Sequence, residues 1–98
     1  MHTLALPAVL TAETVVVAHA QLLRSMQALP ASAAVTLDAS GVQSFDSAGL
    51  ALLLACRRAA QAQGRSLHVQ GWTPSLQSLA QVYGVMPLLD PDAAPLAA

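Results

Sequence analysis

The sequence predicts an α/β fold whose sheet is at least partly parallel. Short β-prone segments alternate with helical segments along the chain, and each connection between predicted strands contains a helix, as parallel strands require. The length of 98 residues is enough for one modest core and too short for two. We therefore expect residues 1–90 to form a single domain and residues 91–98, rich in Pro and Ala, to form a loosely ordered tail.

The first half of the chain predicts a strand, a helix and a second strand. Residues 3–6 alternate like a strand, and Pro7 should end it or place it at a sheet edge, because proline cannot donate to a strand ladder. A helix should begin after Thr11 as its N-cap and run to Leu29, with a core face at helical spacing made of Val15, Ala18, Leu22 and Met26. Residues 34–38 form the next β-prone segment, and residues typical of turns end it.

The second half predicts a helix, a strand and a further helix. The helix should span residues 47–62 and stop at Gly64, and residues 67–70 alternate as a strand. In the last helix Thr73 is a good N-cap and Pro74 suits the first helical position. The expected core face of that helix consists of Leu76, Leu79, Ala80 and Tyr83.

The composition narrows the classes of function. Hydrophobic residues make up 55 % of the chain and charged residues only 9 %, against about a quarter in ordinary soluble domains. This indicates either a surface partly covered by a partner or the Ala-rich composition that a GC-rich genome produces. The formal charge of −1, with four arginines and no lysine, does not indicate the basic surface that binds nucleic acid. No run approaches the roughly 18 apolar residues of a membrane span, and the first residues carry no export signal. We therefore expect a cytoplasmic protein without direct membrane insertion.

The residue patterns of metal and cofactor sites are missing. The three histidines, His2, His19 and His68, lack a paired cysteine or carboxylate at metal-ligand spacing, and the glycines are scattered singly, without a phosphate-binding loop. The lone Cys56 excludes an internal disulfide, fits a reducing compartment and lies among helical leucines, as expected of a small core residue. We therefore expect no metal and no cofactor.

One catalytic alternative is a small enzyme with Ser47 as nucleophile, His68 as base and Asp38 or Asp46 as the group that orients the base. The residues around Ser47 do not form the Gly-x-Ser-x-Gly turn that exposes a nucleophile in hydrolases, and no base lies at a recognisable spacing. The sequence therefore favours a protein that is not an enzyme.

The helix expected at residues 47–62 presents one face that a partner could contact. Its core face gathers small and apolar residues, Gly49, Leu52, Leu53, Cys56, Ala59 and Ala60. The opposite side should face solvent yet carries little charge, which is typical of a protein-binding surface. We define the docking strip as Asp46, Ser47, Ala48, Ala51, Leu54 and Arg58. The alternative is that Leu54 is an isolated exposed leucine, which is common on protein surfaces.

Ser47 allows two interpretations. Serine at a helix start commonly caps unpartnered backbone N–H groups, so Ser47 is a cap candidate. Asp46, however, already offers a side-chain acceptor at the N-cap position, which leaves Ser47 free to point outward as a partner contact or phosphoacceptor. A phosphate there would place about −1.5 to −2 charges at the favourable end of the helix dipole and could block a docked partner.

The chain contains LDASGV at residues 37–42 and FDSAGL at residues 45–50. Together these segments resemble the signature of STAS domains, the sulphate-transporter and anti-sigma-antagonist family. The likeness continues through residues 51–54, 63–64, 67–71 and 79–85. Within the family the chain is most similar to MlaB-like proteins, because of its Gly-Leu-Ala-Leu-Leu-Leu helix start and the residues at 69–71 and 79–83.

The resemblance implies a STAS-like small mixed sheet of about four strands, with helices alternating along the chain. STAS domains usually open with an additional strand before the one expected at residues 3–6, and this chain begins too late to contain it. Either the sheet is one strand smaller, or a partner or second copy supplies that edge, which leaves a homodimer open.

The resemblance to MlaB-like proteins implies a non-enzymatic subunit that binds and supports the ATPase of a phospholipid-transport ABC transporter at the inner membrane. The family hydroxyl then maps onto Ser47, and the adjoining helix face onto Ala51, Leu54 and Arg58. The alternative within the family is an anti-sigma factor antagonist, in which a serine kinase that also holds a sigma factor phosphorylates Ser47. Both hypotheses use the same surface, and the MlaB-like details favour the first.

Overall fold

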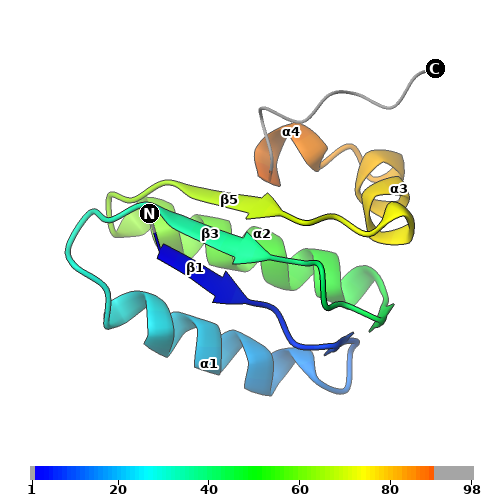
Figure 1. The fold of residues 1–98 in the computed structure, drawn as a ribbon, viewed down its shortest axis with the longest axis horizontal. Coiled ribbons are helices and arrows are strands. Elements are labelled where there is room, and N and C mark those ends of the chain that lie inside the picture. Colours follow the sequence, from blue (N-terminus) through cyan, green and yellow to red (C-terminus); the bar gives the residue numbers. More distant parts are fainter. Residues whose placement is uncertain (1, 90–98) are drawn as a thin grey trace.

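The computed structural model describes residues 2–89, which form a small α/β fold with two parallel sheets (Figure 1). The main sheet has three strands in the order β1-β3-β5, namely β1 (His2–Ala5), β3 (Val35–Asp38) and β5 (Leu67–Gln70). A second, two-stranded sheet pairs β2 (Val9–Leu10) with β4 (Ser44–Phe45). The α/β fold expected from the sequence is confirmed, with every described pairing parallel rather than mixed.

Four helices complete the described part of the chain: α1 (Val15–Gln27), α2 (Ser47–Ala62), α3 (Pro74–Val82) and α4 (Met86–Leu89). The bounds predicted for α2 and β5 are confirmed, and Gly64 ends the α2 segment with a positive φ of 71°. The prediction of a loosely ordered tail at residues 91–98 lies outside the described residues.

One face of the main sheet forms the core. The strand register places Leu4, Leu37 and Val69 side by side, so all three project from the same face. Helices α1 and α2 cover that face (Figure 1) and contribute the buried residues Ala18, Leu22, Met26, Leu53 and Cys56. The core faces predicted for these two helices are therefore confirmed.

Strand β1 lies at an edge of the main sheet, which is one of the two outcomes predicted from Pro7. It pairs only with β3, and within residues 2–89 no strand lies outside it. The additional first strand typical of STAS domains is thus missing from the described part of this chain.

The helix α1 begins later than predicted, so the assignment of Thr11 as its N-cap is wrong. The carbonyl of Thr11 instead accepts hydrogen bonds from the backbone N–H groups of Thr14 and Val15, which closes a turn before the helix. The Thr14 hydroxyl accepts from the Thr11 N–H at 3.0 Å and donates to the Val9 carbonyl at 2.9 Å. These bonds hold residues 11–14 in a turn, and the helix starts only at Val15.

The prediction that Tyr83 belongs to the core face of α3 is also wrong. Leu76 and Ala80 are fully buried, but the helix ends at Val82 and Tyr83 is its C-cap, 57 % exposed. The backbone leaves the helical path at Gly84, whose φ is 71°. The helix therefore ends one residue before Tyr83, and the helical spacing that predicted a buried Tyr83 does not extend to it.

The sequence did not reveal β2 and β4, which consist of two residues each. They bring the chain after β1 against the start of α2, where the packing is very close. A Cβ added at Gly49 would lie 2.6 Å from the backbone oxygen of Leu10, which is closer than real Cβ contacts. Only glycine therefore lets α2 begin directly against β2.

We predict that Gly49→Ala lowers the free energy of unfolding by about 2 kcal/mol, because the new methyl group must displace backbone rather than a flexible side chain. Gly41→Ala is the matched control, since nothing lies within 4 Å of a Cβ at Gly41. Urea denaturation of both variants measures the difference. Equal stability of Gly49→Ala and the parent chain would contradict this account of the contact.

Candidate functional site

The start of α2 is fixed by the carboxylate of Asp46, the N-cap residue. Its Oδ1 accepts a hydrogen bond from the backbone N–H of Ala48 at 2.9 Å, and its Oδ2 accepts from the N–H of Ala12 at 3.1 Å. Asp46 thus caps its own helix and ties it to the turn that precedes α1. The prediction that Asp46 is the cap is confirmed.

Ser47 is the first residue of α2, and its side chain is exposed. Its hydroxyl makes no hydrogen bond to any residue within 2–89. Because Asp46 performs the capping, the cap interpretation of Ser47 is wrong. The hydroxyl remains accessible at the positive end of the helix dipole, and its use as a contact or phosphoacceptor stays a prediction.

A hollow of about 240 Å³ lies directly beside Ser47. Along α2 it is lined by Ser47, Ala51 and Leu54, three residues of the docking strip, together with the buried Leu50. Tyr83 and Val85, from the segment between α3 and α4, form its other wall. Leu54 is half-buried against the core, so it is neither an isolated exposed leucine nor fully solvated.

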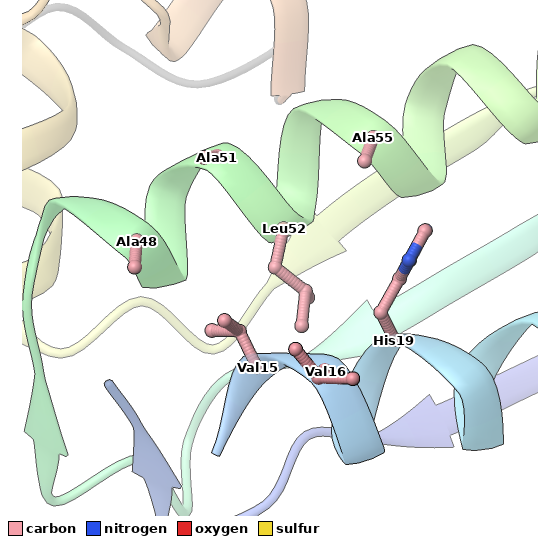
Figure 2. A pocket seen from close by; sticks show the side chains of 7 residues that line it. All are labelled: Val15, Val16, His19, Ala48, Ala51, Leu52 and Ala55. Carbon is pink, nitrogen blue, oxygen red and sulfur yellow. The ribbon is translucent and has the colours of Figure 1, made fainter. Parts of the chain in front are cut away.

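A second hollow, of about 320 Å³, is lined by residues of α2 and of the first turns of α1 (Figure 2). Ala51 also lines it, and Figure 2 shows Ala48, Leu52 and Ala55 of α2 facing a wall of α1 residues. These are Val15, Val16 and His19, and the Nε2 of His19 is buried without a hydrogen-bond partner among the described residues. Since Ala51 lines both hollows, the strip runs along a ridge with an apolar depression on each side.

Four of the six residues of the docking strip, Ser47, Ala48, Ala51 and Leu54, thus line one or both hollows. Asp46 caps the helix and lines neither hollow, and Arg58 is exposed one turn beyond Leu54 and also lines neither. Sequence reasoning missed Tyr83, Val85 and the α1 wall. Local patterns carry no signal for them, because they reach α2 only through the packing of other helices.

The catalytic alternative gains no support from the geometry. Val69 packs on the face of the sheet that α2 covers, and neighbouring residues of a strand point to opposite faces, so His68 points away from α2 and Ser47. The carboxylate of Asp38 instead stabilises the turn that follows β3. Hydrogen bonds to its carboxylate from the Ser40 backbone N–H, at 3.0 Å, and from the Ser40 hydroxyl hold the pKa of Asp38 below its ordinary value.

No other chemical site is evident in the described part of the chain. Among residues 2–89 no group of three His, Cys, Asp or Glu side chains could hold a metal ion. None of the helices within that range has the length and apolarity that crossing a bilayer requires. Cys56 is completely buried, and loss of hydration raises the pKa of its thiol to about 11.

A comparison with protein-family models gave a match that covers the whole described part of the chain. The family model described as "Mlab, STAS domain" matches residues 2–90. The chain belongs to the STAS domain family. Members of this family are generally non-catalytic, and membership supports a small accessory or regulatory protein. No curated protein sequence gave a match to this STAS domain.

We predict that Cys56 of the native STAS domain resists alkylation. A pKa of about 11 instead of the ordinary 9.0 leaves about a hundredfold less thiolate near neutral pH, and the core blocks the reagent as well. Iodoacetamide labelling followed by mass spectrometry should show fast modification only after unfolding. Native labelling at the rate of the unfolded chain would contradict the burial of this thiol.

Proposed function

We propose that this STAS domain is a non-enzymatic accessory subunit that binds the cytoplasmic ATPase of a phospholipid-transport ABC transporter. The observation that carries the proposal is the hollow beside Ser47, where an exposed hydroxyl, a half-buried leucine and an exposed tyrosine adjoin. Such a mixture of a concave apolar centre and a polar rim is typical of protein interfaces. The match to the MlaB-like branch of the family supports an ABC ATPase as the partner.

The proposed mode of action is support of the ATPase by contact. A partner residue enters the hollow between Leu54 and Tyr83, and a polar group of the partner bonds the Ser47 hydroxyl. Aromatic residues at the centre of an interface commonly contribute most of its binding free energy, so Tyr83 is the expected anchor. Attachment to the inner membrane then comes through the transporter complex and needs no membrane segment of this chain.

A second function is regulation by phosphorylation, as in an anti-sigma factor antagonist. The observation that favours it is the free, exposed hydroxyl of Ser47, which the cap does not use. A phosphate on Ser47 would add negative charge beside the Asp46 carboxylate and across the mouth of the hollow. It would repel a partner that contacts this surface while leaving the core of the domain unchanged.

We predict that Leu54→Glu abolishes binding to the ABC ATPase, because a carboxylate at the wall of the hollow would be buried without a partner. Leu88→Glu is the matched control, since Leu88 is 43 % exposed on α4 and does not line the hollow. Co-purification of each tagged variant with the ATPase, and circular dichroism of the domain alone, separate binding from folding. Unaltered binding of a folded Leu54→Glu chain would count against this surface.

For the second function, we predict that a serine kinase which binds the chain transfers phosphate to Ser47 and that Ser47→Ala takes up none. Ser44 and Ser75 are exposed serines elsewhere, so Ser44→Ala should be phosphorylated like the parent chain. Radiolabel incorporation with the purified kinase provides the measurement. Recovery of a serine kinase instead of an ABC ATPase from native cells would overturn the transporter proposal and leave this one standing.

A further inference from the structure

The outer face of α1 carries a line of exposed residues that the core does not explain. Glu13, Val17, Ala20 and Arg24 follow one another at intervals of four, three and four, so they lie on one face of the helix and its preceding turn. That face is opposite to the buried residues of α1. We call these four residues the α1 seam.

The centre of the α1 seam is apolar although it faces solvent. Val17 is 62 % exposed, and Val16 beside it is 77 % exposed, which is unusual for the outer face of a surface helix. The two ends carry opposite charges, Glu13 in the turn before the helix and Arg24 in the last turn of the helix. Within residues 2–89 neither charge forms an ion pair, so both are available to a partner.

The pattern of the α1 seam is complementary to itself. The midpoint between residues 13 and 24 coincides with the midpoint between residues 17 and 20. If a second copy packs its α1 antiparallel across a two-fold axis at that point, each Glu13 faces the Arg24 of the other copy, and each Val17 faces an Ala20. The small Ala20 permits close approach of the two helices, and both charge pairs form at once.

A hollow at the charged end of the seam has the lining that this packing needs. It measures about 430 Å³ and is lined in part by Val9, Glu13, Val17 and Gln21. The side chain of Arg24 from the second copy fits such a site, because its apolar stem can cover Val9 and Val17 while the guanidinium reaches Glu13.

We propose that this chain forms a two-fold dimer through antiparallel packing of α1, with the α1 seam at the centre of the interface. The dimer uses a different helix from the docking strip, and it requires neither the ABC ATPase nor a kinase. The proposal therefore stands or falls independently of the proposed function.

The decisive experiment is a charge swap measured by sedimentation equilibrium over a dilution series of the full chain. The parent chain should dimerise reversibly. Glu13→Arg and Arg24→Glu should each weaken the dimer about tenfold, because two opposite-charge pairs become two like-charge pairs. The double variant should restore the parent dissociation constant, since all pairs are again opposite.

The charge swap also separates dimerisation from a structural effect on α1. Glu13, just before the helix, and Arg24, in its last turn, both suit the helix dipole. Damage to the helix itself therefore adds up in the double variant, whereas an effect on the dimer cancels. A parent chain that remains monomeric, single variants with an unchanged dissociation constant, or a double variant weaker than both singles would each overturn the proposal.

A second pair of variants tests the apolar centre. Val17→Asp should abolish the dimer, because two carboxylates would face a second helix in a desolvated contact. Val82→Asp is the control, since Val82 is 81 % exposed on α3 and lies outside the α1 seam. Circular dichroism should show that both variants keep the parent helix content. Dimerisation of Val17→Asp at the parent level would also overturn the proposal.

Discussion

The Asp46 carboxylate makes the contact on which the arrangement of this domain depends. One oxygen caps α2, and the other binds the N–H of Ala12 in the turn before α1, 34 positions earlier in the chain. Because Gly49 has no side chain, the start of α2 lies directly against the backbone of Leu10. The starts of both long helices are therefore parts of one unit, and the surfaces that they present keep a fixed position relative to each other.

This anchoring explains how a chain with few charges can present two separate surfaces. Because Asp46 satisfies the backbone at the start of α2, the neighbouring Ser47 hydroxyl is released to the surface beside the hollow of Leu54 and Tyr83. The turn that Asp46 binds also sets where α1 begins, and so directs Val17 outward. Apolar groups at both surfaces account for part of the low charged fraction of 9 %.

The sequence was sufficient where local physics decides the structure. The alternation at residues 67–70, the cap and proline at Thr73 and Pro74, and the glycine after α2 each specify an element without help from the rest of the chain. Elements set by distant contacts were not predictable. The two-residue strands β2 and β4 are too short to show an alternating pattern in the sequence. Thr11 resembles a helix cap in the sequence, but in the structure its carbonyl closes a turn before the helix. For the same reason the docking strip was found along one helix, whereas its opposite wall at Tyr83 and Val85 was not.

The central claim is that partners bind the ridge at the start of α2. Amide hydrogen exchange of the purified chain, with and without the ABC ATPase, tests it most directly, because it maps the contact without altering a residue. The account predicts that binding slows exchange at residues 47–54 and 83–85, the two walls of the hollow. Slower exchange confined to other segments, with these two unchanged, would contradict it.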